Sequence, residues 1–381
     1  MAIIAKYLSS INDIDAESWN SITGSNYPFT RHEFLSALEN SGAVCLKTGW
    51  QAQHLTLYED DQLRAVVPLY LKHHSYGEYV FDWAWADAFH RHGVNYYPKL
   101  LAAIPFTPAT GPRLCIDPDI NDAQHYRDII QQQLIDHAQS HQLSSLHILF
   151  TQQSELGNSP AALLTRQAVQ FHWFNQDYQS FDDFLQGFSS RKRKNLNKER
   201  RQVKEQGIQL QRLKGSEVSP AQWQQFHHFY QLTYAKRSGH GGYLNAEFFQ
   251  AVAASMPENI LLVVAEKANR MVAAALYFCD SQTLYGRYWG CAEEYAMLHF
   301  EACYYQGIEY CIENQLQRFD PGAQGEHKIA RGFSPIFTYS QHWINHPAFA
   351  DAIADFLQRE KPEIENYHQY CTDLLPFKHT Q

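Results

Sequence analysis

The feature of this sequence that most restricts its fold is an order of elements that occurs twice. In each half, three apolar segments separated by short polar turns precede a helical segment and then one more short strand. Alternating apolar and polar residues predict half-buried strands, and short turns predict antiparallel neighbours. The two segments share strand lengths and turn positions but little identity: LTLYEDDQLRAVVPLYLKHHSYGEYVFDW and LVVAEKANRMVAAALYFCDSQTLYGRYWG. We therefore expect a repeat of architecture rather than of sequence.

The first half begins with an alternating strand at 3–8 and a helix at 28–40. The repeat then contributes three expected strands, HLTLYE, LRAVVPLYLKHH and EYVFDWAW, the second of which contains Pro68. Because proline has no N–H for a strand ladder, Pro68 predicts an edge strand or a bulge. The half ends with four further elements: a strand at 99–106, the loop TPATGPR, a helix at 122–140 and a strand at 146–150.

The second half opens with helical material that the first half lacks. A helix beginning at Phe181 runs into RKRKNLNKERRQVKEQG, in which residues 191–204 hold eight Lys or Arg and one Glu. Turn-forming residues at 155–159 predict a boundary, which gives domains of 1–155 and 156–381, with the basic helix 181–206 inserted in the second. We expect the remaining elements in this order: a strand at 208–213, helices at 220–236 and 245–256, strands at 260–266, 271–279 and 284–289, a helix at 297–315, strands at 318–319 and 336–344, and a helix at 348–359.

Composition excludes several classes of protein. With 381 residues, 45% of them hydrophobic and 14% aromatic, the chain has the size and content of two ordered domains. The net charge of −9 argues against a surface that coats nucleic acid and leaves only local basic patches to consider. The seven cysteines are scattered without a CxxC pair, and neither a signal peptide nor an apolar run of about 18 residues is present. We expect a cytoplasmic protein with reduced thiols and no metal.

The order of meander, helix and strand, found twice, resembles the outline of tandem GNAT-type (N-acyltransferase-like) domains. Three segments are similar to parts of FemAB-type aminoacyltransferases: YQSFDDFLQGFSSRKRKNLNKERRQVKEQGI, GYLNAEFFQ and YGRYWG. Two more resemble hallmark stretches of the FemAB-like peptidoglycan biosynthesis/recognition family: YVFDWAWADAFHRHGVNYYPKLLAAIPFTPATGPRL and DPGAQGEHKIARGF. The resemblance to this family extends over nearly the whole chain. It implies an α/β (α+β) fold of two GNAT-like domains, each a mixed, mostly antiparallel sheet flanked by helices.

The resemblance also implies an activity and its substrates. The activity would be transfer of an acyl or aminoacyl group to an amine, with acyl-CoA or aminoacyl-tRNA as donor and a cell-wall precursor as acceptor. Two features of such relatives are missing. No heptads form a coiled-coil arm for transfer RNA, and no Gln/Arg-x-x-Gly-x-Gly/Ala motif follows the fourth strand of either domain. The segment KRSGHG at 236–241 fits that motif loosely but precedes the meander.

The loop after the strand at 318–319 is rich in glycine and in charged side chains. Acyl transfer to an amine needs a base for the amine proton, and positive or hydrogen-bonding groups where oxyanion charge develops. Lys328 and Arg331 are our candidates for the oxyanion or a phosphate, and Glu326 and His327 are our candidates for the base. The alternative is a surface turn in which Glu326 pairs with Arg331.

An aromatic segment of the first half also carries acids and histidines. Alternation along the expected strand places Asp82 on the face opposite Trp83 and Trp85. A metal site built from Asp87, His90 and His92 is disfavoured, because His-x-His is only a pair and a third clear ligand is lacking. We instead expect a groove that binds a polar acceptor, with core packing as the alternative, and its candidate residues are Asp82, Trp85, Arg91, Tyr96, Tyr97 and Lys99.

The turn TPATGPR occupies the strand-to-helix connection that faces the cofactor in GNAT folds. Its backbone amides and Arg113 could cradle an anion. Because Pro108 and Pro112 each remove a donor, a rigid turn without a ligand is the alternative. Further substrate-binding candidates in the second half are Tyr288, Glu301 and Tyr304, and Glu301 is also a candidate base.

Helical spacing places Arg191, Lys194, Lys198 and Arg201 on one stripe of the basic helix. This basic stripe is expected to contact a phosphate or phospholipid, in a peripheral contact with a membrane, or transfer RNA; a solvated face is the alternative. The sequence thus predicts an N-acyl- or aminoacyltransferase whose substrate cleft lies between the two domains. The competing class is a non-catalytic recognition protein that binds a cell-wall precursor or another phosphorylated ligand.

Overall fold

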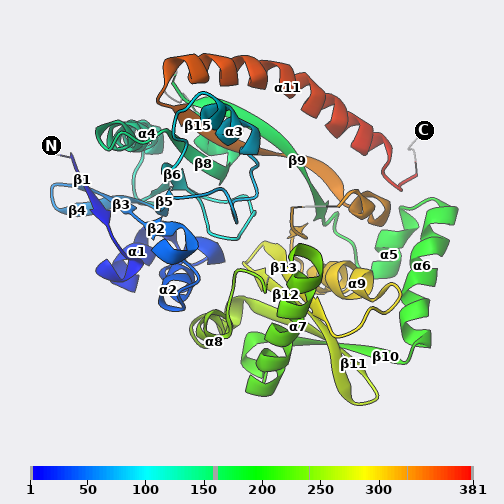
Figure 1. The fold of residues 1–381 in the computed structure, drawn as a ribbon. Coiled ribbons are helices and arrows are strands. Elements are labelled where there is room, and N and C mark those ends of the chain that lie inside the picture. Colours follow the sequence, from blue (N-terminus) through cyan, green and yellow to red (C-terminus); the bar gives the residue numbers. More distant parts are fainter. Residues whose placement is uncertain (1–2, 158–161, 240, 324, 379–381) are drawn as a thin grey trace. The chain divides into compact units, whose positions relative to one another are not determined.

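The computed structural model describes residues 3–157, 162–239, 241–323 and 325–378. The chain forms two compact units (Figure 1), the first from Met1–Val169 and Phe337–Tyr367, the second from Gln170–Ile336 and His368–Gln381. It passes between the units inside three elements: β9 (Leu164–Phe174), β15 (Ser334–Ile344) and α11 (Pro347–Asp373). Each unit is therefore built from two separate stretches of sequence. The boundary at 155–159 stays a prediction, and positions 158 and 159 lie outside the described residues.

The first unit contains two rows of strands. The order β1-β3-β4-β7 forms an antiparallel sheet from Ile3–Leu8, His54–Glu59, Gln62–Val67 and Cys115–Ile116. In the second row, β15 is followed by β8 (Ser145–Thr151), β6 (Lys99–Ala102), β5 (Leu69–Lys72) and β2 (Trp50–Ala52). Of these pairs, β6 and β8 are parallel and the others antiparallel.

Helices close the core of the first unit. These are α1 (Ala16–Thr23), α2 (His32–Asn40), α3 (Trp83–Arg91) and α4 (Ala123–Ser140). Helix α4 buries Tyr126, Ile130 and Leu134, at helical spacing, against strand residues such as Leu55 and Leu100. Short 3-10 turns occupy Ile11–Asp13, Pro28–Thr30, Leu46–Thr48 and Gln153–Glu155.

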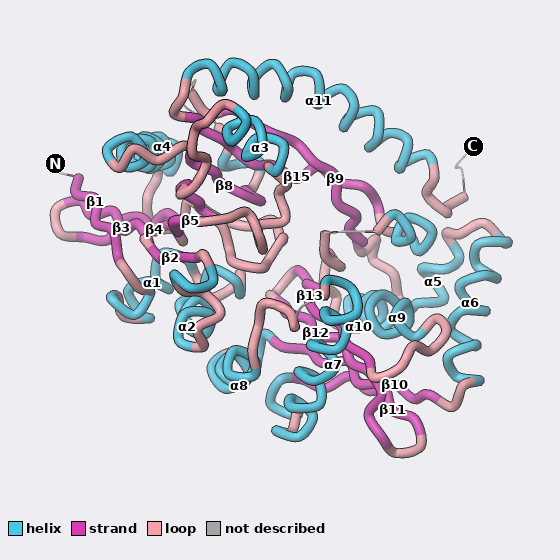
Figure 2. The backbone as a smooth tube through the Cα atoms, viewed as in Figure 1, coloured by secondary structure: helices cyan, strands magenta, loops and turns pink. Residues whose placement is uncertain are grey.

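Two expectations for this unit are wrong. The expected strand around Pro68 is two strands, because Pro68 separates β4, which pairs with β3 and β7, from β5, which pairs with β2 and β6. The segment 78–85, expected as a third strand, contains no strand: residues 78–82 are loop, and the last three residues begin α3 (Figure 2). Trp85 and Phe89, four residues apart, are buried, whereas Trp83 is 41% exposed. Burial thus follows the helical period, which the alternation of Trp and Asp over a few residues concealed.

The second unit contains the meander that the sequence predicted. Strands β10 (Ile208–Lys214), β11 (Ile260–Lys267), β12 (Arg270–Cys279) and β13 (Thr283–Cys291) are antiparallel neighbours in this order. Strand β14 (Arg318–Asp320) pairs in parallel with β13, and Trp173 and Phe174 of β9 pair with β14 on its other side. The predicted strands of this meander are confirmed.

The basic region of the second unit is two helices rather than one. Helix α5 (Phe181–Gln186) ends before the basic helix α6 (Ser190–Glu205), and Figure 2 shows a loop between them. The predicted helix at 297–315 is confirmed. It consists of three consecutive segments: α9 (Leu298–Phe300), a π-helical turn (Glu301–Tyr305) and α10 (Gln306–Glu313). 3-10 turns lie at Gly215–Glu217 and Pro257–Asn259.

Helices α7 (Pro220–Ser238) and α8 (Ala246–Ser255) complete the second unit. Helix α7 lies close against β13, because a Cβ atom at Gly290 would stand 2.4 Å from the backbone of Phe229. Glycine is therefore required by the close approach of helix and strand. Within the described parts of the chain, no helix combines the length and apolar content that crossing a membrane requires.

Candidate active site

Strands β13 and β14 are paired along only a short part of their length. The parallel register runs from Thr283, opposite Arg318, to Tyr285, opposite Asp320. Strand β13 then continues to Cys291, whereas β14 ends and the chain turns into residues 320–333, which we call the Lys328 loop. A loop that follows a buried strand is a common position for binding and catalytic residues.

Lys328 is the most deeply buried basic side chain of the Lys328 loop. It lies on the 3-10 turn Glu326–Arg331, is 1% exposed, and donates a hydrogen bond from Nζ to the carbonyl oxygen of Gly322 at 2.5 Å. Among the described residues, no carboxylate lies within ion-pair distance of Nζ. Burial lowers the pKa of Lys328 to about 7, against the opposing effect of the Asp320 charge. The lysine thus changes charge near neutral pH.

Several buried polar side chains surround the end of β14. Asp320 Oδ1 lies 3.6 Å from His172 Nε2 and 3.9 Å from Arg287 Nη2, and it accepts a hydrogen bond from the Gly322 amide. Burial opposes the charge of Asp320, but His172 and Arg287 lower its pKa. Burial also lowers the pKa of His172 to about 4, so this imidazole is neutral at pH 7. Asp320 Oδ2 has no hydrogen-bond partner in the described part of the chain.

His327 extends from the Lys328 loop to the π-helical turn. Its Nε2 lies 2.8 Å from the hydroxyl oxygen of Tyr304. Burial, together with the charges of Arg331 and Lys328, lowers the pKa of His327 to about 4, so it is unprotonated at neutral pH. Gly325 has φ of 113°, and a Cβ there would overlap the His327 ring at 2.2 Å. The conformation that brings His327 to Tyr304 therefore requires glycine at 325.

Arg331 connects the Lys328 loop to the basic helix. Its Nη2 donates to both carboxylate oxygens of Glu199 at 2.9 Å, and its Nη1 donates to the His327 carbonyl oxygen at 2.7 Å. The guanidinium also lies 3.5 Å from the centre of the Phe300 ring. Tyr305 donates a hydrogen bond to Glu199 as well. Glu199, the single acid in the basic run, thus holds Arg331 in place.

Glu301, a candidate base, is already engaged. Its carboxylate accepts two hydrogen bonds from Arg200, at 3.0 and 2.9 Å, and one from Gln306 at 2.9 Å. Arg200 also pairs with Glu309 at 2.7 Å. Tyr288, a further candidate, is 7% exposed and packs edge-on against Tyr230 and Phe249. The functions of Glu301 and Tyr288 stay predictions.

The candidates of the first unit form a separate buried network. Lys99 Nζ contacts Glu78 Oε2 at 2.8 Å and Asp82 Oδ2 at 2.5 Å, and Tyr96 donates to Asp82 at 2.6 Å. The expected strand face of Asp82 is wrong, since this residue precedes α3. The structure does bring Asp82, Tyr96 and Lys99 together, but all three are at most 4% exposed. Their proposed contact with an acceptor stays a prediction.

The other first-unit candidates lie around this network. Trp85 is buried, with its ring edge-on to His342, and Tyr97 is half-buried with its hydroxyl 2.8 Å from Ser75. Arg91 is exposed on α3 and pairs with Asp87. Among the described residues no group of three potential metal ligands is found.

The turn at 107–113 is tied to the edge of β8. The Gly111 amide donates to the Phe150 carbonyl oxygen, and Arg113 Nε donates to that of Leu149 at 2.8 Å. Arg113 is fully buried, and its Nη2 bonds the Ala109 carbonyl oxygen at 2.7 Å. In the first unit, protein backbone thus occupies the strand edge beyond the short β6–β8 pairing, and the anion-binding role of Arg113 stays a prediction.

The basic stripe lies on the exposed side of α6. Arg191, Lys194, Lys198 and Arg201 are all exposed, while Leu196 and Val203 of the same helix are buried. The predicted grouping of the four cations on one face is therefore present. What this stripe contacts stays a prediction.

Sequence reasoning found the Lys328 loop but missed three residues of the site. Asp320, His172 and Glu199 lie far apart along the chain and come together only by folding. One signal was present for Asp320, which directly ends the predicted strand at 318–319. No comparable signal marked His172, and Glu199 was taken as one acid in a basic run.

Comparisons with known proteins agree with this geometry. A family profile described as FemAB-like, peptidoglycan biosynthesis/recognition, matches residues 10–379. A search of individually curated sequences gives no match. The C-terminal domain of a putative lysylphosphatidylglycerol synthetase from Agrobacterium fabrum superposes with a TM-score of 0.55 and 10% identity, over 91% of this chain and 96% of that one. FemX superposes with a TM-score of 0.53 and 11% identity, over 93% and 100%.

The fold is that of the tandem GNAT-like class. Within this class, the chain belongs to the FemAB-like family, because the family profile covers nearly all of it. The description of this family names both peptidoglycan biosynthesis and recognition. The predicted fold class and family are confirmed.

Proposed function

We propose that the protein transfers an acyl or aminoacyl group to an amine by direct attack at the Lys328 loop. The observation that carries this proposal is the burial of Lys328 with a backbone carbonyl, rather than a carboxylate, as its partner. A charged ammonium in such a place is poorly stabilised until an anion arrives. An oxyanion that forms beside this ammonium is strongly stabilised by its charge, because the surroundings exclude water.

The steps of the reaction assign one task to each group. The acceptor nitrogen attacks the donor carbonyl carbon, the carbonyl electron pair moves to oxygen, and the Lys328 ammonium stabilises that oxyanion. His327, unprotonated at neutral pH, accepts the proton of the attacking amine. The tetrahedral intermediate then collapses and expels the thiolate or alkoxide of the donor, which takes the proton. Arg331, held by Glu199, positions the backbone of His327, and Glu326 stays a candidate for the proton transfer.

The acceptor is proposed to be a precursor of peptidoglycan, since the family description names that polymer. The donor would be an acyl-CoA or an aminoacyl-tRNA, and the exposed basic stripe of α6 would contact its phosphates. A cytoplasmic site of action follows from such donors. The sharing of one substrate cleft by the two units stays a prediction.

Activity measurements on the full-length protein test this proposal. Thermal-shift screening with acetyl-CoA, aminoacyl-tRNA and nucleotide-linked cell-wall precursors first identifies a donor and an acceptor, because a specific ligand raises stability with concentration. Replacing Lys328 by Ala should then lower kcat by about 100- to 1,000-fold, the usual cost of losing one oxyanion contact, with little change in ligand affinity. The matched control is Lys47→Ala, at an exposed position of the first unit.

Two results would contradict the proposal. Turnover by the Lys328→Ala variant close to that of the parent would remove Lys328 from the mechanism. Tight binding of a cell-wall precursor by the parent protein, without transfer from any of the donors, would instead favour a recognition protein, the second function in the family description.

A further inference from the structure

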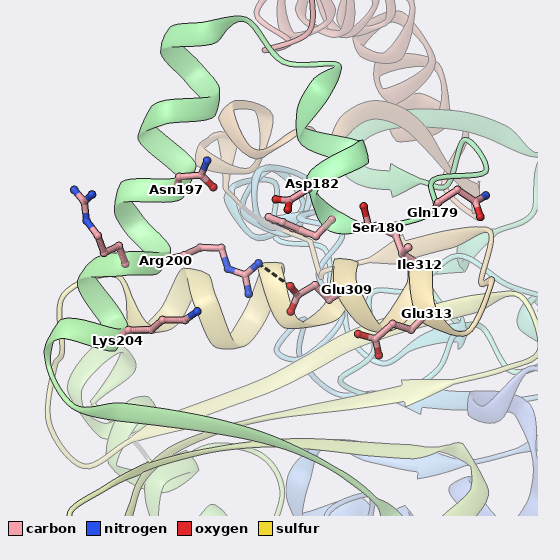
Figure 3. Close-up of a pocket in the computed structure, with 11 residues that line it drawn as sticks. Gln179, Ser180, Asp182, Asn197, Arg200, Lys204, Glu309, Ile312 and Glu313 are labelled. Atoms are coloured by element: carbon pink, nitrogen blue, oxygen red, sulfur yellow. Dashed lines mark hydrogen bonds and ion pairs between the residues drawn. The ribbon is translucent and has the colours of Figure 1, made fainter.

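A pocket of about 630 Å³ lies in the second unit. Its walls come from the start of α5, the C-terminal half of α6 and α10 (Figure 3). This volume falls in the range of about 300–1,000 Å³ that is usual for small-molecule sites. The pocket lining contains no residue of the Lys328 loop.

Charges of both signs line the pocket in equal number. Helix α6 contributes three cations, and α5 and α10 contribute three carboxylates: Arg200, Arg201 and Lys204, and Asp182, Glu309 and Glu313. In Figure 3 the Arg200 and Lys204 side chains extend from α6 toward the acids on α10. A lining with no net charge offers little to a polyanion, but it suits a ligand that carries one charge of each sign.

Most of these charges already have protein partners. Arg200 pairs with Glu309 and Glu301, Arg201 lies 3.4 Å from Glu205, and Glu313 accepts from Arg212 at 2.8 Å. In contrast, the side chains of Lys204, Asp182 and Asn197 make no hydrogen bond or ion pair with the residues that the structure describes. The pocket therefore presents one uncommitted cation, one uncommitted carboxylate and one uncommitted amide.

We propose that this pocket binds a small zwitterion, with its anionic group at Lys204 and its ammonium group at Asp182. Asn197 can donate to the first group or accept from the polar middle of the ligand. The Phe181 ring, with the Arg200 guanidinium 4.5 Å from its centre, supplies a firm apolar wall. The proposal goes beyond the transfer reaction and does not depend on it, because the pocket has no residue in common with the Lys328 loop. Arg201 lines the pocket and also belongs to the basic stripe, so neither pocket variant is placed at that residue.

Two sources of such a ligand share this chemistry: a short peptide with free ends, and a phosphoethanolamine group. Ligand-observed NMR titrations of the full-length protein distinguish them when triglycine and phosphoethanolamine are used as separate probes. Acetyl-triglycine and triglycine amide, which each lack one charge, report on the ammonium and the carboxylate separately. Because partly exposed ion pairs contribute modestly, we expect about a fivefold loss of affinity for each charge removed.

Variants assign each end of the probe to a residue. In Lys204→Met, triglycine and triglycine amide should bind equally, because the partner of the carboxylate is gone; in Asp182→Asn, triglycine and acetyl-triglycine should bind equally. The matched control is Lys192→Met, on the same helix but outside the pocket, which should leave all affinities unchanged. With phosphoethanolamine as the bound probe, both pocket variants should weaken binding.

The outcomes are decisive in either direction. The assignment is supported if one zwitterion binds and its affinity falls in Lys204→Met and Asp182→Asn as described above, but not in Lys192→Met. The assignment is overturned if neither zwitterion binds at concentrations of about 50 mM, or if both pocket variants bind it as the parent does. Loss of transfer in Lys328→Ala leaves this measurement untouched, so the failure of one proposal is distinguishable from the failure of the other.

Discussion

Lys99 in the first unit and Lys328 in the second are both almost completely buried, but their charges are controlled differently. Lys99 lies 2.8 Å from Glu78 and 2.5 Å from Asp82 and is 0% exposed. Burial opposes its charge, but the two carboxylates raise its pKa, so it stays charged at neutral pH. Lys328, 1% exposed, bonds a backbone carbonyl, and burial lowers its pKa to about 7.

The difference shows how one residue type serves structure in one place and chemistry in another. A lysine whose charge is neutralised by two acids is stable as it stands and has little to gain from a ligand. A buried, charged lysine without such acids lowers the stability of the fold, and an anion that binds beside it reduces this loss. The strand edges also differ: the Gly111 amide bonds the Phe150 carbonyl oxygen of β8 in the first unit, whereas in the second unit β14 ends at Asp320 and β13 continues to Cys291.

The largest effect on stability should come from removing Lys99, whose charge is neutralised by two acids. Lys99→Ala leaves Glu78 and Asp82 buried without a cation, and breaking such a pair typically costs about 3–5 kcal/mol. We expect the free energy of unfolding in urea to fall by about this amount. The double variant Lys99→Ala with Asp82→Asn should recover part of the loss. An unchanged free energy would mean that the network contributes nothing to stability.

The second prediction concerns the pH dependence that Lys328 confers. Its pKa is about 7 in the folded protein and 10.5 as the reference value, so between these pH values the unfolded chain binds more protons. Stability therefore rises with pH across this window, and the penalty for the buried charge is complete below about pH 7. Compared with the parent, Lys328→Met should be more stable near pH 6, by a few kcal/mol, and the advantage should shrink toward pH 10.

Urea titrations of both proteins at intervals from about pH 6 to pH 10 measure this difference. A constant gap between the two proteins would show that Lys328 does not change charge in this range. Lys328→Met also separates stability from activity, since the variant should be more stable than the parent but less active.

A smaller effect is expected from Glu199, which holds Arg331. Glu199→Gln keeps the shape but removes the carboxylate, and hydrogen bonds between charged groups contribute about 1.5–3 kcal/mol. We expect kcat to fall by about tenfold, with a smaller change in KM. The control is Glu205→Gln on the same helix, whose bond to Arg201 is solvent-exposed. Equal kinetics in the two variants would separate Glu199 from the site.

The smallest effect per residue should come from the basic stripe. If its four cations contact phosphates of transfer RNA, the logarithm of the association constant should fall steeply with the logarithm of salt concentration. Replacing Arg191, Lys194, Lys198 and Arg201 by Gln should reduce that slope by about three. Filter binding of bulk transfer RNA measures it, and a slope that does not change would exclude this contact.

Much of the second unit could be predicted because its strands obey a simple period. In residues 260–291, three apolar segments are separated by short turns, and the structure has its three strands at the positions that this pattern predicts. The first unit is harder, because its elements break local rules. Pro68 divides two sheets, and the segment before Phe89 alternates like a strand although it begins a helix. In both places long-range packing overrides the local pattern.

The sequence by itself determined the family, the meander of the second unit and the loop that carries Lys328, His327 and Arg331, because these depend on local order and on spacing along the chain. Only the tertiary structure decided what surrounds them. His172 and Glu199 meet the Lys328 loop from two separate elements, β9 and α6, and His172 lies beside Asp320 at the start of that loop. The pKa of a buried lysine depends on which carboxylates stand within a few ångströms of it, and that distance is a property of the folded chain alone.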